Sequence, residues 1–282
     1  MNDKYLLKLH DEILTIMDEI HRVCLEQELQ YYLIGGTLLG AIRHGGFIPW
    51  DDDMDIVMPR KDYERFINNV GHWLSPGFKL EWITTNPEYV YPFAKVSKQG
   101  TLFVDSPYTK HTGIFVDIFP LDTCSSYSAK IRHRKFAFKK LNAVMWHKLM
   151  KDCFPKYWFD WLPSKMMSYR FIHRLMRAVA KSSGTDCDEY YANYGSQYDI
   201  KKQTMPKEWF GQGKLANFED REYLIPEHAE KILTSIFGLQ YMKLPPEEKR
   251  RSHYPEKVIF SDGEIMEFAY EHKVSVNEQE SV

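Results

Sequence analysis

The stretch GGTLLGAIRHGGFIPWDDDMDIVMP, residues 35–59, decides the fold and the site. It crowds four aspartates between residues 51 and 55 against apolar neighbours, although like charges held this close repel one another. The letters MDIVMP predict a short buried strand, and residues two apart on a strand point to the same face, about 6.8 Å apart. Asp53 and Asp55 are therefore expected to point together, whereas Asp52 is expected to point away.

A third carboxylate is expected from a neighbouring strand, and Asp117 is the best candidate. It is a single acid inside the apolar run GIFVDIF, where burial of an ionised carboxylate without a partner is costly. Together with Asp53 and Asp55 it would form a hard oxygen site suited to Mg²⁺ or Mn²⁺. Because these three carboxylates are expected to face one another, Asp117→Asn should leave the metal-free protein at least as stable as wild type. The residues alone leave two alternatives open, namely that Asp117 pairs with a buried Arg or Lys and that the cluster is a solvated loop.

Gly35, Gly36 and Thr37 lie between a predicted buried strand, YYLI, and a predicted helix, TLLGAIRH. Threonine is a favourable N-cap residue, so this helix is expected to start at Thr37. Glycine lets the backbone approach a phosphate closely, and a helix N-terminus supplies N–H donors and a positive dipole end. The order of glycine loop, helix, Asp-x-Asp strand and distant Asp suits a phosphoryl group held by a metal while a hydroxyl attacks it. A Gly-Gly pair by itself is also common in turns.

The first part of the chain, residues 1–125, is predicted to be an α/β (α+β) core with a mixed sheet. A helix is expected near residues 5–30, another at KDYERFINNVGHWL, and strands at KLEWITT, YVYPFAKVS, TLFVDS and GIFVDIFPLD. Three further regions follow: a helical, basic and aromatic-rich region over 126–215 that is ambiguous after 188, a hairpin, helix and loop that pack on the core over 216–272, and a disordered tail over 273–282. The helical region is expected to break near Pro155 and Pro163.

Charge is spread unevenly along the 282 residues. Lys130–Lys181 holds 14 Lys and Arg against two acids, a local net charge of +12, although the whole chain has a net charge of −2. This region is therefore expected to meet an anionic membrane or an anionic glycan, and the small total charge gives no general attraction to nucleic acid. The four scattered cysteines and the lack of any apolar run of about 18 residues predict a cytoplasmic protein, at most peripheral on the inner face of the membrane.

The motif LIGGTLLGAIRHGGFIPWDDDMDI resembles the core motif of the LicD family, which includes fukutin-related proteins. The segments YPFAKV, GIFVDIFPLD, REYLIPEHAEKILTSIFG and YMKLPPEEKR extend this resemblance over most of the chain, most weakly over residues 127–215. The resemblance implies a nucleotidyltransferase-like fold that moves a phosphorylated group from a CDP-linked donor, CDP-choline above all, to a hydroxyl of a lipid-linked or surface glycan. Bacterial members add phosphocholine to teichoic acid or lipopolysaccharide glycans, and related eukaryotic members transfer ribitol phosphate.

The resemblance also implies roles for single residues. It matches Gly35, Gly36 and Thr37 to the phosphate loop of the family. It matches Asp53, Asp55 and Asp117 to the acids that bind the metal, and Asp51 to a further acid outside the metal's own ligands. It gives Asp52 no role. Lys95, in PFAKV, and Arg43 are expected to neutralise phosphate charge. Lys95 could instead be a surface lysine on a strand, and Arg43 a solvated helix residue.

Choline is a quaternary ammonium ion, and aromatic faces bind such cations. The densest aromatic cluster, MWHKLMKDCFPKYWFDW, offers four candidates for a choline cage, which could equally be core residues: Trp146, Tyr157, Trp158 and Trp161.

Three alternative functions remain open from the sequence. The donor could carry ribitol phosphate or glycerol phosphate in place of phosphocholine. A true nucleotidyltransferase, which releases pyrophosphate from a nucleoside triphosphate, could use the same carboxylates. A scaffold protein on this fold would be expected to have lost one of the three acids, and this chain keeps Asp53, Asp55 and Asp117.

Overall fold

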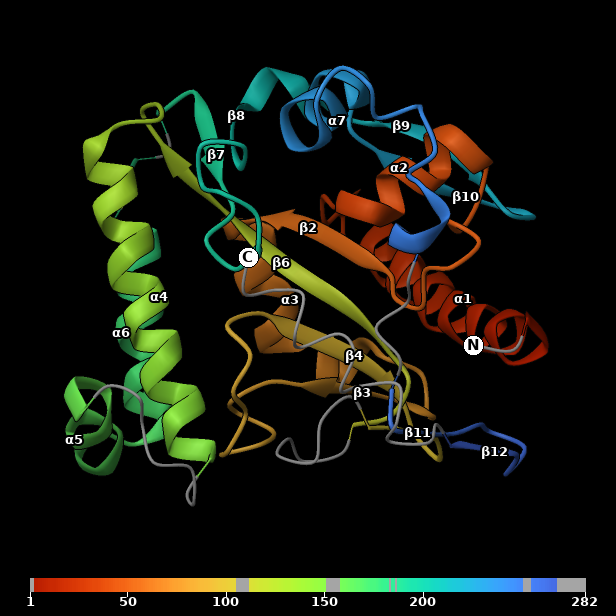
Figure 1. Ribbon diagram of the computed structural model, residues 1–282, viewed down its shortest axis with the longest axis horizontal. Helices are drawn as coiled ribbons and strands as arrows, with labels where there is room; N and C mark the ends of the chain where they lie inside the picture. The colour runs from red at the N-terminus through yellow and green to blue at the C-terminus, as the bar shows by residue number, and fades with distance from the viewer. Residues whose placement is uncertain are drawn as a thin grey trace.

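The computed structural model describes residues 3–104, 112–150, 158–182, 184–185, 187–250 and 255–267. Its central sheet has the strand order β1-β2-β6-β4-β3, and only β2 and β6 in that path run parallel (Figure 1). The strands of this path are β1 (Tyr32–Leu33), β2 (Asp55–Pro59), β3 (Phe78–Glu81), β4 (Ala94–Lys98) and β6 (Phe115–Cys124). The predicted mixed α/β class is confirmed.

One face of the sheet is apolar and is covered by helices α1 (Asp3–Glu26) and α3 (Arg60–Trp73), which lie behind it in Figure 1. Ile56, Ile118 and Ala94 form one row of this face across β2, β6 and β4, and all three are fully buried. Side chains alternate between faces along a strand, so the neighbouring row, one residue earlier on β2 and β6 and one later on β4, must point to the opposite face.

Helix α2 (Gly35–His44) begins two residues before the predicted start, so the expectation of an N-cap at Thr37 is wrong. Thr37 lies in the first turn, and its hydroxyl accepts a hydrogen bond of 2.8 Å from the backbone N–H of Asp55. The threonine therefore ties the helix to the start of β2 instead of capping the helix.

The predicted helical region contains α4 (Ala129–Leu149), α5 (Trp158–Met166) and α6 (Tyr169–Lys181). Pro163 lies inside α5, and that helix ends three residues later at Met166, so the predicted break near Pro163 is found. The next helix, α6, begins after Ser168, whose hydroxyl accepts from the N–H of Phe171 and caps it. Pro155 lies outside the described residues.

The ambiguous segment after residue 188 adds two strands to the sheet. Strand β7 (Tyr190–Ala192) pairs with the end of β6, and β8 (Thr204–Pro206) pairs with β7. One short turn of 3₁₀ helix, η1 (Lys207–Trp209), follows β8.

The last part of the chain contains the predicted hairpin, β9 (Lys214–Phe218) with β10 (Arg221–Ile225), and the predicted helix, α7 (Ala229–Phe237), which ends at Gly238. After η2 (Glu247–Lys249), β11 (Lys257–Ile259) pairs with both β12 (Ile265–Glu267) and β5 (Leu102–Val104). The expected tail over 273–282 lies outside the described residues. No helix in the described part of the chain is both long and apolar enough to span a bilayer.

Candidate active site

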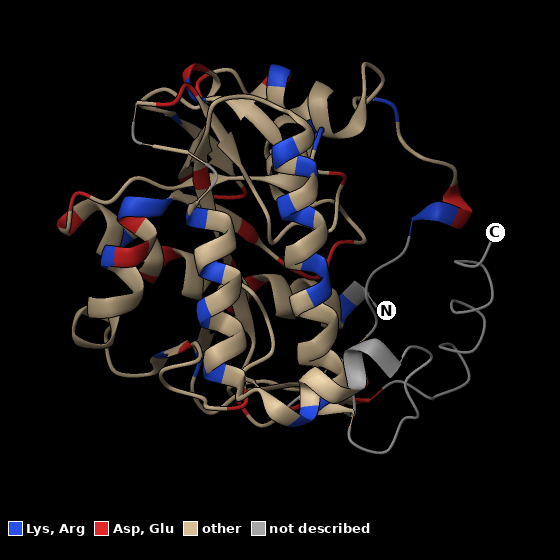
Figure 2. Ribbon diagram, turned by 90° about the vertical axis from the view of Figure 1, so that its left-hand side faces the viewer, with Lys and Arg blue, Asp and Glu red and all other residues tan. Residues whose placement is uncertain are grey.

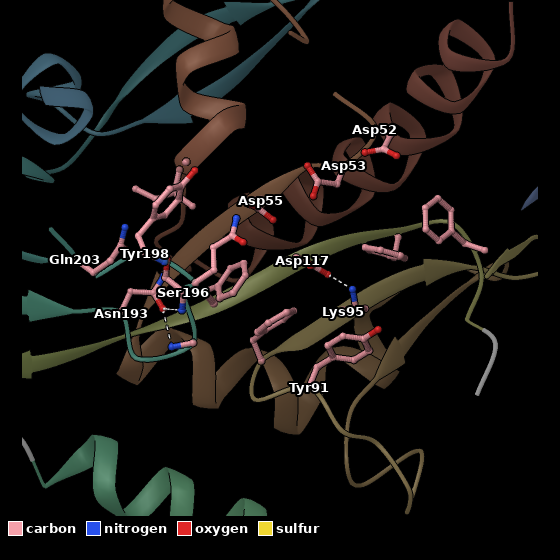
Figure 3. Close-up of a pocket in the computed structure, with 18 residues that line it drawn as sticks. Asp52, Asp53, Asp55, Tyr91, Lys95, Asp117, Asn193, Ser196, Tyr198 and Gln203 are labelled. Atoms are coloured by element: carbon pink, nitrogen blue, oxygen red, sulfur yellow. Dashed lines mark hydrogen bonds and ion pairs between the residues drawn. The ribbon is translucent and has the colours of Figure 1, made fainter. Parts of the chain in front are cut away.

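The register of three neighbouring strands places charged residues in one row. Asp55 of β2 lies opposite Asp117 of β6, and Asp117 lies opposite Lys95 of β4. Residues opposite each other in a ladder point to the same face, so all three point away from α1 and α3. They line a cavity of about 460 Å³ on that face (Figure 3).

Four acidic residues border the cavity: Asp52, Asp53, Asp55 and Asp117. The predicted convergence of Asp53 and Asp55 on one site is therefore found. Asp52 also borders the cavity, but its carboxylate is turned away from the other three, as predicted (Figure 3). It is 2% exposed, and its charge acts on His10 of α1.

The carboxyl of Asp55 is buried among other acidic residues. Burial, followed by the negative charges of Asp53, Asp117 and Asp51, raises the pKa of the Asp55 carboxyl well above its usual range. The positive charge of Lys95 opposes this shift.

Asp117 forms an ion pair with Lys95, whose Nζ lies 2.6 Å from Asp117 Oδ1 (Figure 3). Lys95 is 3% exposed, so it is not a surface lysine. Of the alternatives that the sequence left open, pairing of Asp117 with a buried basic residue describes the structure. The same ammonium also lies over aromatic rings, 3.4 Å from the ring centroid of Phe115 and 4.5 Å from that of Tyr91.

The two glycines bring the start of α2 against the carboxylates. Gly35 lines the cavity with φ +60°, and a Cβ added there would lie 3.6 Å from Asp55 Oδ2. A Cβ on Gly36 would lie 2.9 Å from Asp51 Oδ2, so the end of the Asp51 side chain would have to shift. The positive φ favours glycine at residue 35. The first N–H groups of α2 have no partner within the helix and can meet an anion.

Arg43 is not brought into the cavity. It lies in the last turn of α2, and its guanidinium donates to the carbonyl oxygens of Tyr241 at 3.0 Å and Lys243 at 3.4 Å. Arg43 therefore fastens the segment after α7 to α2.

The segment that connects β7 and β8 forms another wall of the cavity, and the sequence analysis missed it. The lining residues from this segment are Asn193, Gly195, Ser196, Gln197, Tyr198 and Gln203. Burial, followed by the charges of Asp55, Asp51 and Asp53, raises the pKa of Tyr198 to about 12. Tyr198 is therefore a neutral hydroxyl beside the carboxylates. The segment carries no helical or strand periodicity, so only its polar and aromatic composition could have marked it.

This wall is fixed by two sets of hydrogen bonds. Asn193 Oδ1 accepts from the backbone N–H groups of Gly195 at 3.0 Å and Ser196 at 3.1 Å. From α4, Lys135 Nζ donates to the carbonyl oxygens of Tyr194 and Ser196, each at 2.7 Å. Lys135 is 5% exposed, and its burial lowers its pKa to about 8. A buried lysine of the helical region therefore holds the wall in place.

The aromatic residues of the cavity differ from those predicted for a choline cage. Five phenyl and phenol rings line it beside Tyr198: Tyr91, Phe93, Phe103, Phe115 and Phe119. Of the four predicted residues, Trp146 packs edge-on against Tyr91 with 5.9 Å between ring centroids, outside the cavity lining. Tyr157 and the side chains of Trp158 and Trp161 lie outside what the structure describes.

A divalent metal fits the chemistry of these donors. Asp53, Asp55 and Asp117 offer only carboxylate oxygens, which Mg²⁺ and Mn²⁺ prefer, and a cation would relieve the repulsion around Asp55. Within the described residues, no three or more acidic, His or Cys side chains are already gathered closely enough to hold a metal. Asp117 would have to exchange Lys95 for the metal as its cationic partner.

Comparison with known proteins decides the family. Residues 28–169 match the model of the LicD/FKTN/FKRP nucleotidyltransferase domain. The chain is also 31% identical over 249 residues to the lipopolysaccharide cholinephosphotransferase LicD of Haemophilus influenzae, an alignment that covers 86% of this chain and 92% of that protein. The chain belongs to the LicD family. It is therefore a transferase, and the predicted family membership is confirmed.

Two other comparisons cover less of the chain. The ribitol 5-phosphate transferase FKRP of Mus musculus is 53% identical over 34 residues, which is 12% of this chain and 7% of that protein. An uncharacterized protein of Rickettsia typhi is 31% identical over 81 residues, 29% of this chain and 25% of that protein. All eight predicted site residues fall within the segment that matches the LicD-family model, whereas the wall between β7 and β8 lies beyond it.

Proposed function

We propose that this LicD-family enzyme transfers phosphocholine from CDP-choline to a hydroxyl of a cell-surface glycan, a lipopolysaccharide or teichoic acid precursor, and releases CMP. The observation that carries the proposal is the convergence of Asp53, Asp55 and Asp117 on one cavity beside the glycine-rich start of α2. Identity to the Haemophilus cholinephosphotransferase over most of both chains supports choline as the transferred alcohol.

The residues of the cavity have distinct parts in this reaction. Asp53, Asp55 and Asp117 would hold Mg²⁺ or Mn²⁺, which supplies positive charge to the phosphate oxygens when bound. The first N–H groups of α2, at Gly35 and Gly36, donate to the donor diphosphate. The acceptor oxygen forms a bond to the phosphorus that carries choline, and the bond from that phosphorus to the CMP oxygen breaks.

The acceptor hydroxyl must also lose its proton. Asp117 is the proposed acceptor if Asp53 and Asp55 alone hold the metal, because its carboxylate lies in the cavity beside Asp55. Lys95 would leave Asp117 for the phosphate when the donor binds, and there its ammonium offsets the negative charge of the leaving group.

The helical region would contact the membrane that carries the acceptor. Figure 2 shows Lys and Arg in bands along the two long helices on one side of the molecule, α4 and α6. Phe136 of α4 and Phe171 of α6 are 63% and 46% exposed, and basic helices with exposed aromatic rings suit an anionic membrane. We place the enzyme in the cytoplasm, bound peripherally to the membrane that carries a lipid-linked acceptor.

Product analysis tests the reaction. The protein is incubated with Mg²⁺, a lipopolysaccharide acceptor and, in turn, CDP-choline, CDP-ribitol, CDP-glycerol or CTP, and products are separated by chromatography. CMP and acceptor-bound phosphocholine from CDP-choline would support the proposal. Preference for CDP-ribitol would favour the chemistry named for FKRP. Pyrophosphate from CTP, with no CMP from any CDP compound, would show a nucleotidyltransferase instead.

A further inference from the structure

One side of the cavity is an aromatic wall that already holds an ammonium group. We define the aromatic wall as Tyr91, Phe93 and Phe115. The Nζ atom of Lys95 lies 3.4, 4.5 and 5.5 Å from the ring centroids of Phe115, Tyr91 and Phe93 respectively (Figure 3). All three distances fall within the range of a cation–π contact.

Further aromatic contacts hold the wall in place. Phe103 packs edge-on against Phe115 with 5.1 Å between centroids, and Phe119 lies 4.0 Å from Phe93. Trp146 of α4 packs edge-on against Tyr91. Rings fixed in this way lose little freedom when a ligand binds, so the wall is preorganised for a cation.

The position of the wall matches the geometry of the donor. In the sheet, β6 lies between β2 and β4, so Lys95 is on the far side of Asp117 from Asp55 and the start of α2. Tyr91 and Phe93 precede Lys95 in the chain, and Phe115 is two residues before Asp117 on β6. A donor whose diphosphate lies at Gly35 and Asp55 can therefore extend its alcohol group across Asp117 to the wall.

The chemistry of the wall discriminates between donor alcohols. A trimethylammonium group has no hydrogen-bond donors and gains from aromatic faces. A ribitol or glycerol group would press several hydroxyls against carbon rings, and unpaired buried hydroxyls are costly. Among the described lining residues on this side, the polar groups are Lys95, Asp117 and the Tyr91 hydroxyl, and Lys95 and Asp117 are paired with each other.

We propose that the aromatic wall binds the quaternary ammonium group of the donor in the place that Lys95 now occupies, and so selects choline over polyol alcohols. Lys95 gives up its ring contacts and turns to the donor phosphate, so that one cation replaces another. This inference rests on the proposed function, because it assumes a CDP-linked donor in this cavity.

Direct binding tests the wall without turnover. Isothermal titration of the full chain with Mg²⁺ compares CDP-choline with CDP-3,3-dimethylbutanol, which has the same shape without the positive charge. Wild type should bind CDP-choline more tightly by between about three-fold and thirty-fold, the range of a desolvated cation–π contact. Tyr91→Leu and Phe115→Leu should remove most of this preference, whereas Tyr91→Phe should keep it because the ring face remains.

The controls separate selectivity from folding. Tyr127→Leu changes a partly exposed ring outside the cavity lining and should bind both donors like wild type. Melting temperatures confirm that each variant folds. If Phe115→Leu does not fold, Tyr91→Leu and Tyr91→Phe decide the matter, because Tyr91 is only partly buried.

Three outcomes would overturn the inference, and the third is distinguishable from the first two. Equal wild-type affinity for the two donors, or an equal loss for both in Tyr91→Leu, would remove the aromatic wall as a choline site while leaving CDP-dependent transfer intact. Binding of CTP with no binding of any CDP compound would overturn the proposed function as well.

Discussion

Lys95 and Asp117 lie opposite each other on β4 and β6, with 2.6 Å between ammonium nitrogen and carboxylate oxygen. Both residues are buried, at 3% and 8% exposure, and Asp55 lies next to Asp117 in the same row. Removal of one member of a buried pair leaves an uncompensated charge, which costs more than the pair itself contributes. Lys95 therefore partly balances the negative charge of the row.

Because of this ion pair, we expect the metal-free Asp117→Asn variant to be less stable than wild type. The sequence alone predicts that the metal-free variant is at least as stable as wild type, but the loss of the ion pair should destabilise it. We expect Lys95→Met and Asp117→Asn each to lower the free energy of unfolding by about 3 kcal/mol. The double variant should lose much less than the sum. Urea denaturation without metal measures this, and strictly additive losses would contradict coupling between the two side chains.

Asp55→Asn should stabilise the metal-free protein and abolish its response to metal. The ionised Asp55 carboxylate is disfavoured by burial and by its acidic neighbours, so a neutral amide removes that cost. We expect Mn²⁺ to raise the melting temperature of wild type but not of Asp55→Asn, and transfer to fall at least about a hundredfold in Asp53→Asn and Asp55→Asn. Asp220→Asn, whose carboxylate is 80% exposed, is the matched control. Wild-type turnover in either cavity variant would disprove the metal assignment.

Lys135→Met should loosen the wall between β7 and β8. The variant loses two hydrogen bonds from a charged donor to the carbonyls of Tyr194 and Ser196, so kcat/KM should fall about tenfold. Hydrogen exchange should show faster exchange at the N–H groups of Gly195 and Ser196. Lys201→Met removes an exposed lysine of the same segment and should change neither quantity. Unchanged exchange in Lys135→Met would mean that Asn193 alone holds the wall.

The sequence predicts the acidic half of this site better than the rest. Asp53, Asp55 and Asp117 can be picked out in the sequence because they are charges within or beside apolar runs. The structure brings all three to one cavity. The partnership of Lys95 with Asp117 depends on the register of β4 against β6, which no local pattern specifies. Tyr198 lies in the segment between β7 and β8. Each of these strands has three residues, which is too short for a periodic pattern in the sequence.

His173 should make the protein sensitive to acid. Burial, above all, lowers the pKa of His173 from 6.5 in the unfolded chain to about 4 in the folded one. Between these values the unfolded state binds a proton that the folded state does not, so stability is present above pH 6.5 and falls as pH drops toward 4. The full difference is about 3 kcal/mol.

Urea denaturation from pH 7 to pH 4 checks this expectation. His173→Gln removes the titrating ring, so its free energy of unfolding should fall less with acid than that of wild type. His133→Gln replaces an exposed histidine of α4 and should follow wild type. Parallel pH profiles for wild type and His173→Gln would contradict a role for His173.

The basic faces of α4 and α6 should bind anionic vesicles in a salt-dependent way. Co-sedimentation with vesicles containing phosphatidylglycerol should be strong at low salt and weak when the screening length falls below about 8 Å. Arg132→Glu combined with Arg174→Glu, both exposed, should weaken binding, whereas Lys214→Glu on the distant β9 should not. Equal sedimentation with neutral vesicles would rule out an electrostatic membrane contact.

The helices α4, α5 and α6 leave the sheet at the end of β6 and return at β7, and these two strands pair directly, with Cys124 opposite Tyr190. The helical segment therefore begins and ends at the same place in the sheet, as an insertion between two paired strands. An insertion whose ends meet can be exchanged between relatives without moving the carboxylate row on β2 and β6. Evolution, or a protein engineer, can in this way keep one phosphate chemistry and redirect it to a new acceptor by grafting a different set of helices.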